Sequence, residues 1–443
     1  MSSRHVVVVG GGIAGLTAAL RLAESGVRVS LIEATARLGG KIRTADDGIE
    51  TGAEQFLMRT PDGGPSGAAR LVSDLGLGDR LTHPALSAAG LWVGGRLQSM
   101  PPGTLMGVPG FSAALDGVAT LADDDRDLGV PVLAGQDVAV GELVRSRLGG
   151  EVVEHLVDPL LGGVYAGQAD LLSLRATIPN LYAALQTAHT LRDGVGASLV
   201  KRSAAGPVFG TLRGGLSSLV EALTGRLLDL GVTIHYGKPL RSLDDVDADG
   251  YVLACPAKPA AALLPAPVAE RVSVLDYASV GLVTLRLPGA ELPQLTGFLV
   301  PADQGLSIKA ATFFSRKWEH LSGQPEPAVR VSVGRYGEVG ALALTDEALG
   351  EAVQADLAKV LGPLPAASAV RVTRWGGALP QYAPGHVERV AEARSLLEAE
   401  HRAGREAGPK PVVLAGAAFD GVGLPVCITS GEKAAADLGE FVK

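Results

Sequence analysis

Three glycines near the start of the chain, Gly10, Gly12 and Gly15, have the spacing G-x-G-x-x-G, and Glu33 follows Gly12 by 21 residues. Glycines at this spacing can form a turn that binds phosphate groups. The first permits a tight turn, the second lets backbone approach a pyrophosphate, and the third lets a helix pack closely on a strand. A carboxylate about 20 positions further on accepts the hydroxyl groups of an adenosine ribose. The spacing therefore predicts a dinucleotide-binding site.

The segments around these glycines must place them between a strand and a helix. Residues 6–9 are four consecutive valines, a β-branched run that is typical of a buried parallel strand. Residues 13–25 carry apolar side chains at helical spacing, and Gly26 stands where a glycine commonly ends a helix. A second strand is expected over residues 27–32 and leads directly into Glu33. The N-terminus of the helix would attract the pyrophosphate.

The uncharged stretch over residues 6–20 has two other interpretations. It resembles the apolar region of a secretory signal peptide, but such a peptide has no reason to space three glycines in this way. It is also shorter than the about 20 residues that a membrane span requires. An ordinary tight turn between a strand and a helix is the remaining alternative, which the register of strands, glycines, helix and acid disfavours.

Two short motifs follow Glu33. The first contains Ala34, Arg37, Gly39, Gly40 and Lys41, and the second contains Gly52, Ala53, Glu54 and Gln55. With these motifs the chain resembles the flavin-dependent amine oxidase superfamily, which includes porphyrinogen oxidases, monoamine and polyamine oxidases, and carotenoid desaturases. The resemblance implies that FAD is the cofactor, that the first motif continues the adenosine and pyrophosphate site, and that the second passes beside the isoalloxazine.

Distant segments extend the resemblance. Leu240 stands where the family usually has a valine whose backbone meets the adenine, and a strand over residues 412–416 precedes a glycine-rich helix start. The resemblance implies that this helix begins at the flavin pyrimidine, where its positive end stabilises the reduced flavin. A final strand and helix that only complete the sheet are the alternative. The implied FAD-binding residues are Gly10, Gly11, Gly12, Ile13, Ala14, Gly15, Glu33, Ala34, Arg37, Gly39, Gly40, Lys41, Gly52, Ala53, Glu54, Gln55, Leu240, Trp375, Gly416, Gly421, Val422, Gly423 and Leu424.

Residues 156–179, residues 375–386 and the segment from Gly421 resemble the porphyrinogen oxidase branch of the superfamily. This resemblance implies a porphyrinogen substrate and no catalytic acid or base. The substrate-contacting residues that it implies are Tyr165, Ala166, Gly167, Arg175 and Phe313. By chemistry alone, the side chains that could hold substrate propionates are Arg59, Arg175, Arg213, Arg316 and Lys317, for each of which a solvated surface charge is the alternative.

The resemblance implies an α/β fold with three parts. A discontinuous, Rossmann-like FAD-binding domain of the amine oxidase and glutathione reductase type is expected over residues 1–80, 205–275 and 380–443. A helical part is expected over residues 82–195, and in membrane-associated relatives this part touches lipid. Residues 276–378 alternate between apolar and polar side chains and are expected to form an antiparallel substrate-binding sheet.

Composition restricts the possible partners and the compartment. The formal net charge of −8 gives no basic surface for nucleic acid and predicts at most peripheral membrane contact. Cys255 and Cys427 form no paired motif, and the eight histidines include no pair spaced four residues apart. No metal site is therefore expected. With so few cysteines, a reducing cytoplasm is the expected location.

The expected function is FAD-dependent, oxygen-dependent six-electron oxidation of coproporphyrinogen III to coproporphyrin III in haem biosynthesis, with hydrogen peroxide as product. Protoporphyrinogen IX oxidation is the near alternative, and it would suit a more membrane-docked enzyme. A flavin amine oxidase or carotenoid desaturase is more distant, because an amine site favours an aromatic cage and aromatic residues make up only 4% of the chain. A non-enzymatic protein like the GDP-dissociation inhibitors is also considered, and the intact phosphate motif argues against it.

Overall fold

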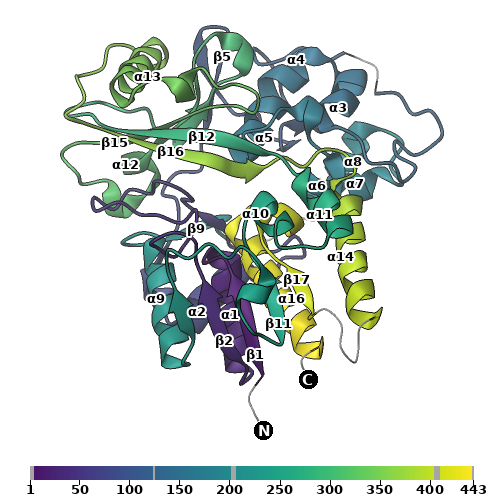
Figure 1. The fold of residues 1–443 in the computed structure, drawn as a ribbon. Helices are drawn as coiled ribbons and strands as arrows, with labels where there is room; N and C mark the ends of the chain where they lie inside the picture. The colour runs from purple at the N-terminus through teal and green to yellow at the C-terminus, as the bar shows by residue number, and fades with distance from the viewer. Residues whose placement is uncertain (1–3, 123–124, 201–205, 404–409, 442–443) are drawn as a thin grey trace.

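The computed structural model describes residues 4–122, 125–200, 206–403 and 410–441. The expected domain limits at residues 1, 205 and 443 lie outside this described part. The molecule has a lower half built on a parallel sheet and an upper half in which a second sheet lies beside a group of helices (Figure 1).

The parallel sheet gathers strands from distant parts of the chain. Its central strand is β1, whose four valines are all buried, because helices cover both faces of the sheet. The valine run thus forms the buried strand that its composition predicts, and the α/β fold class is confirmed. The strand order is β10 (Thr233–His235), β2 (Arg28–Ile32), β1 (His5–Val9), β11 (Gly250–Leu253) and β17 (Val412–Leu414).

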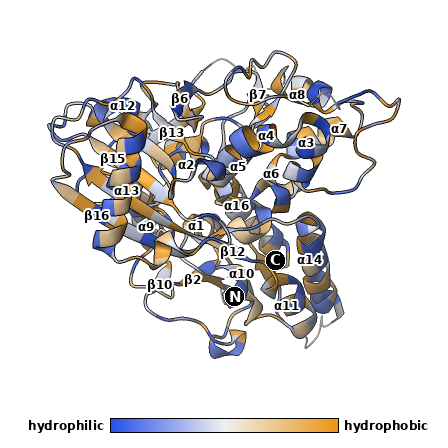
Figure 2. Cartoon of the chain, turned by 90° about the horizontal axis from the view of Figure 1, so that it is seen from above, coloured by the Kyte–Doolittle hydropathy of each residue, from blue (hydrophilic) through white to orange (hydrophobic). Residues whose placement is uncertain are grey.

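Helices from both ends of the chain lie side by side on one face of this sheet. There, α1 and α16 approach so closely that a Cβ on Gly431 would overlap the carbonyl oxygen of Ala14. The outer helix α14 is largely hydrophilic in Figure 2. One face is covered by α1 (Ile13–Glu24), α2 (Gly67–Asp74), α9 (Ser217–Asp229) and α16 (Leu424–Phe441), and the other by α10 (Ala257–Ala261), α11 (Ala266–Ser273) and α14 (His386–Ala403).

The upper sheet has seven strands and is antiparallel except where β13 pairs with β5. One of its faces packs on α13 (Asp346–Leu361), a helix within the range expected to form only a sheet. The strand order is β16 (Ala369–Pro380), β12 (Tyr277–Arg286), β15 (Ala328–Val333), β14 (Ile308–Phe313), β13 (Gly297–Leu299), β5 (Gly90–Val93) and β6 (Arg96–Ser99).

Residues 90–99 lie within the range expected for the helical part. They form β5 and β6 and extend the upper sheet. Each strand has only four residues, which is too short for a clear alternating pattern, and β5 pairs with a strand some 200 residues further along the chain. The pairing is therefore decided by tertiary contacts.

The helical group lies beside the upper sheet around a core of its own. Among the described residues, no helix is both long and apolar enough to cross a membrane. The helices are α3 (Val140–Leu148), α4 (Gly150–Val152), a π-helical turn (Val153–Val157), α5 (Asp158–Tyr165), α6 (Leu174–Thr177), α7 (Pro179–Leu185) and α8 (Leu191–Val200). Besides several single-turn 3-10 helices, the chain forms the short helices α12 (Phe314–Lys317) and α15 (Ala417–Asp420), the small sheet of β3 (Phe56–Leu57), β9 (Phe209–Leu212) and β4 (Leu81–Thr82), and the hairpin of β7 (Thr104–Leu105) and β8 (Val108–Pro109).

Candidate cofactor site

The three glycines of the turn between β1 and α1 have different surroundings. Gly10 has a φ of +108°, and a Cβ there would lie 2.6 Å from the carbonyl oxygen of Ala254. A Cβ on Gly15 would overlap the carbonyl oxygen of Gly10. By contrast, a Cβ on Gly12 would meet no described atom within 4 Å. Packing therefore requires Gly10 and Gly15, whereas Gly12 faces open space at the start of α1, where the first N–H groups have no partner within the helix.

The second glycine pair lies directly against this turn. The N–H of Gly39 donates to the carbonyl oxygen of Gly11 at 2.8 Å, and a Cβ on Gly40 would lie 3.1 Å from the Cα of Gly12. Arg37 donates to the carbonyl oxygen of Gly40 at 2.7 Å, and its guanidinium lies 5.7 Å from the ring centre of Trp375. In this structure Arg37 therefore holds the loop that carries the glycine pair.

Glu33 stands at the carboxyl end of β2, as its spacing predicts. Its carboxylate accepts the N–H of Gly11 at 2.8 Å and the N–H of Thr35 at 2.7 Å. The N–H of Gly237, just after β10, donates to the carbonyl oxygen of Thr35 at 2.9 Å. Leu240 follows and is half-buried on the face of the sheet opposite α1. The two segments implied to meet the adenosine therefore lie next to each other.

The segment with Gly52 is held between the lower and upper halves. A Cβ on Gly52 would overlap the carbonyl oxygen of Lys41 and would lie 3.3 Å from the ring of Trp375. The indole N–H of Trp375 donates to the carbonyl oxygen of Thr51 at 2.6 Å. Trp375 thus fastens strand β16 to this segment. The Oε1 atom of Gln55 is buried and has no hydrogen-bond partner among the described residues.

Glu54 does not face open space. Its carboxylate lies 2.8 Å from Nζ of Lys317, is also paired with Arg330, and accepts the indole N–H of Trp318 at 3.1 Å. Burial opposes ionisation, but Lys317 and Arg330 outweigh it and lower the pKa of Glu54. The geometry gives the side chain of Glu54 a role in joining the two halves.

At the C-terminal end, a network of polar side chains shapes the loop before α16. Ser430 accepts the N–H of Gly416 at 2.7 Å and donates to Asp420 at 2.5 Å, and Asp420 forms an ion pair with Arg394 at 2.8 Å. Gly421 and Gly423 have φ values of +127° and +106°. The predicted site residues did not include Asp420, Ser430 or Arg394, whose roles depend on contacts between three helices.

The start of α16 lies close to the glycine turn of α1. A Cβ on Gly416 would lie 3.6 Å from the Cβ of Ala14. Burial lowers the pKa of Lys41 and raises the pKa of Cys427 in the first turn of α16 to about 11, and the two groups interact electrostatically. The predicted cofactor residues from both ends of the chain thus converge at the carboxyl edge of the parallel sheet.

The predicted substrate residues do not converge. Tyr165 is buried with its hydroxyl directed at the carbonyl oxygen of Thr177, and Phe313 is fully buried on the face of the upper sheet that packs on α13. Arg175 is paired with Glu388. A Cβ on Gly167 would lie against Leu172 and Gln381. Ala166 is the member that packs on the opposite face of the upper sheet, with Val280, Ala378 and Trp375.

The basic residues considered for propionates have varied surroundings. Lys317 is occupied by Glu54, and Arg316 donates to the carbonyl oxygen of Leu292 at 3.0 Å. Arg59 donates to the carbonyl oxygen of Gly63 at 3.1 Å, and Arg213 is exposed. Lys317 therefore contacts the cofactor segment around Gly52 through Glu54, whereas Arg175 pairs with Glu388 of α14.

Comparison with known proteins agrees with this geometry. The sequence profile of the flavin-containing amine oxidoreductase family matches residues 13–439. The chain belongs to this family. It is 38% identical over 464 residues to the coproporphyrinogen III oxidase of Mycobacterium leprae, with 98% of each chain covered. It is 33% identical over 484 residues to the protoporphyrinogen oxidase of Homo sapiens, again with 98% of each covered.

A solved structure from Exiguobacterium sp. 255-15, assigned to protoporphyrinogen oxidase, is 31% identical and superposes with a TM-score of 0.83 over 99% of each chain. As a member of the flavin-containing amine oxidoreductase family, the protein is an FAD-dependent oxidase. The predicted FAD cofactor and enzymatic function are confirmed.

The residues of the site fit FAD. Gly12 leaves room where a pyrophosphate requires it, and the free N–H groups at the start of α1 can bind an anion. The orphaned Oε1 of Gln55 offers an acceptor to an N–H of a bound group. The start of α16 supplies a positive potential close by.

Proposed function

We propose that this flavoenzyme oxidises coproporphyrinogen III to coproporphyrin III in haem biosynthesis, with molecular oxygen as the electron acceptor and hydrogen peroxide as the product. The observation that carries the proposal is the similarity to the mycobacterial coproporphyrinogen III oxidase, which extends over 98% of both chains. The glycine turn and the start of α16 are both built as an FAD site requires.

The reaction removes six hydrogens from the macrocycle, so each substrate requires three two-electron steps. When bound, FAD supplies the hydride acceptor for each of these steps. The role of the protein's own residues is to bind the cofactor and to orient it relative to the substrate. The turn at Gly12 would receive the pyrophosphate, Trp375 holds the Gly52 segment in place, and the N-terminus of α16 would stabilise negative charge on the bound flavin.

Protoporphyrinogen IX oxidation is the second candidate, which the 33% identity to the human protoporphyrinogen oxidase favours. The division into FAD-binding, helical and substrate-binding parts belongs to the same proposal. The cytoplasmic location, with at most peripheral membrane contact and no nucleic-acid partner, stays a prediction from composition.

The test follows porphyrin fluorescence with coproporphyrinogen III and protoporphyrinogen IX side by side, together with oxygen consumption and peroxide release. We expect faster turnover of coproporphyrinogen III with stoichiometric peroxide. Faster turnover of protoporphyrinogen IX would replace the first candidate with the second. No turnover of either porphyrinogen, alongside activity on an amine, would overturn both.

A further inference from the structure

Strand β14 contains an irregularity at Lys309. Ile308 pairs with Val333, and Ala310 pairs with Ser332, the residue next to Val333 in β15. Lys309 is therefore the extra residue of a β-bulge. Bulges turn a side chain away from the regular alternation of a strand and are frequent beside active sites.

The side chain of Lys309 is buried, and among the described residues it has no carboxylate within ion-pair distance. The residue is 6% exposed, and its Nζ donates one long hydrogen bond, of 3.4 Å, to the carbonyl oxygen of Gly162 in α5. That oxygen already accepts the N–H of Ala166 at 3.0 Å. A buried cation is costly unless a counter-charge and further hydrogen bonds satisfy it.

The charged groups around Lys309 do not supply that counter-charge. Arg335, just after β15, is buried and donates to the carbonyl oxygens of Val300 and Ile308. Its acidic partner Glu338 lies 3.5 Å from Arg335 and is half-exposed. Asp158, at the start of α5, accepts the N–H of Ala169 at 2.7 Å. Burial and the neighbouring Arg335 lower the pKa of Lys309 to about 7, and a bound anion is the complement that would favour the charged form of its amine.

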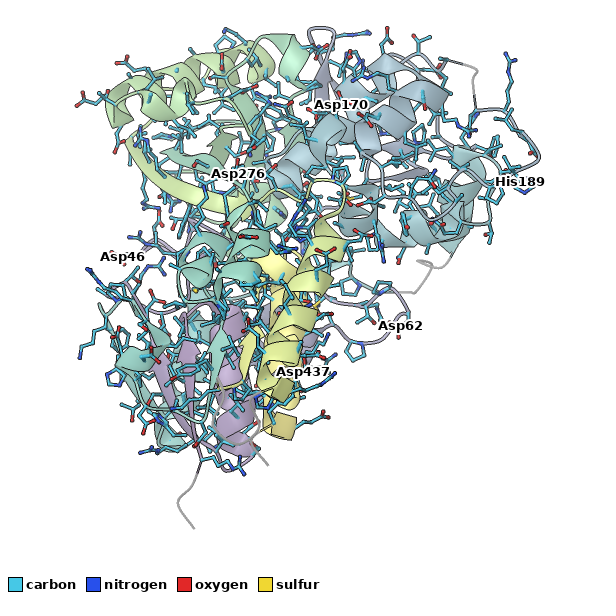
Figure 3. The ribbon with its side chains drawn as sticks, turned by 45° about the vertical axis from the view of Figure 1, so that its right-hand side comes forward. Asp46, Asp62, Asp170, His189, Asp276 and Asp437 are labelled. Atoms are coloured by element: carbon cyan, nitrogen blue, oxygen red, sulfur yellow. The ribbon has the colours of Figure 1, made fainter. Side chains whose placement is uncertain are left out.

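Lys309 also lies next to the face of the upper sheet that is opposite α13 and is directed toward the cofactor segments. Ala166, one turn after Gly162 in the chain, packs on that face with Val280 and Trp375. Trp375 is bonded to Thr51 in the segment beside the cofactor. Tyr336 ties this region together, since its N–H donates to the carbonyl oxygen of Ala166 and its hydroxyl donates to Asp276 at 2.7 Å, a residue labelled in Figure 3.

The surface beside Lys309 is partly open and apolar. Gly163 and Val164 of α5 are exposed, and Leu299 and Ala310 of the sheet are half-buried. A Cβ on Gly163 would lie 3.6 Å from a methyl group of Leu299. A flat apolar ring with acidic arms suits such a surface, because the ring covers the apolar side chains while a carboxylate reaches the cation.

We propose that Lys309 binds a propionate carboxylate of the porphyrinogen and contributes to the preference for coproporphyrinogen III. The proposal rests on the proposed function. Coproporphyrinogen III carries four propionates and protoporphyrinogen IX carries two. Comparing the effect of a Lys309 substitution on the two substrates therefore measures how much a carboxylate contact contributes to the preference. Lys309 is a binding residue and takes no part in the oxidation itself.

The test compares the FAD-loaded wild type with K309M and K309R, and uses K359M as the matched control. Lys359 is an exposed lysine on α13, on the opposite side of the same sheet, where it pairs with Asp356. We expect K309M to raise KM for coproporphyrinogen III about 10- to 100-fold, the effect of losing a charged hydrogen bond. Its kcat should change less than twofold, and K309R should recover most of the affinity.

A binding measurement separates the anchor from a purely structural role. Lys309 also donates a hydrogen bond to the carbonyl oxygen of Gly162 in α5. In a purely structural role, its loss in K309M would lower the unfolding temperature and leave the affinity for the substrate unchanged. Titration with coproporphyrin III, followed by its fluorescence, should show the same loss of affinity in K309M and none in K359M. The loss should be smaller for protoporphyrin IX.

The outcomes are distinct. A K309M variant that keeps its FAD and binds coproporphyrin III as tightly as wild type would overturn the Lys309 proposal. An equal loss for both porphyrins would overturn its role in preference. A wild type that turns over neither porphyrinogen would instead defeat the proposed function.

Discussion

Substitutions at the glycines of the turn between β1 and α1 should cause different defects, in FAD binding at Gly12 and in stability at Gly15. G12V should fold, because a Cβ at Gly12 meets no described atom within 4 Å and its φ of −74° suits any residue, but it should lose FAD. G15A should be destabilised by about 1–3 kcal/mol or more, since its Cβ overlaps the carbonyl oxygen of Gly10. Flavin absorbance per protein and thermal unfolding measure the two effects. A G12V variant with stoichiometric FAD would contradict the role given to Gly12.

Glu50 predicts a pH dependence of stability. Its side chain is almost fully buried and accepts the N–H of Leu216 at 2.5 Å and the hydroxyl of Thr44 at 3.1 Å. Burial raises the pKa of Glu50 from 4.5 to about 7 despite these bonds. The folded state therefore holds a proton that the unfolded state loses, and stability falls as the pH rises from about 4.5 to about 7.

The E50Q variant checks this dependence. Glutamine keeps the acceptor oxygen and does not ionise, so the fall in unfolding temperature between pH 5 and pH 7 should become shallower. E351Q, on the exposed side of α13, is the control and should follow wild type. If E50Q and E351Q show the same pH dependence as wild type, Glu50 does not ionise in this range.

The start of α16 depends on a network that joins three helices. Arg394 of α14 pairs with Asp420 at the end of α15, and Ser430 of α16 bonds both Asp420 and Gly416. R394M should release the loop from Gly416 to Gly423 and weaken FAD binding about tenfold, since a charged hydrogen bond contributes about 1.5–3 kcal/mol.

Titration of the apoprotein with FAD, followed by the quenching of flavin fluorescence, measures this loss. R402M is the control, because Arg402 lies on the same helix, is 67% exposed and pairs with the exposed Glu398. Equal FAD affinity in R394M and R402M would show that the ion pair does not position the loop.

The two halves of the molecule are joined by ion pairs along residues 44–56, which are buried at Glu54 and partly exposed at Asp47. Glu54 from the lower half meets Lys317 and Arg330 of the upper half, and Asp47 meets Arg286 and Arg371. Together with the bond from Trp375 to Thr51, these contacts fix the upper sheet over the cofactor segments.

E54Q should therefore destabilise the whole molecule. Removing one partner of a buried ion pair costs about 3–5 kcal/mol, because the remaining charges stay buried. E398Q removes an exposed pair on α14 and should cost less than about 0.5 kcal/mol. Urea unfolding of the FAD-bound protein compares them, and equal midpoints would rule out the joining role of Glu54.

The sequence by itself determined the elements whose requirements are local. A run of four valines favours a buried parallel strand. The turn at Gly10 needs a positive φ, which glycine adopts without strain. Glu33 follows from the same local order, because the strand length places it at the edge of the sheet beside the turn. The family and the FAD cofactor rest on such spacings.

Only the tertiary structure decided which side chains remain open to a ligand. Glu54 lies in a cofactor motif, yet Arg330, 276 residues further on, takes its carboxylate. Phe313 became a core residue because its side of β14 packs on α13, while the bulge turned Lys309 away from that side. The physical reason is that the exposure of these side chains depends on which faces of distant elements pack together. The spacing of residues along the chain does not determine that packing.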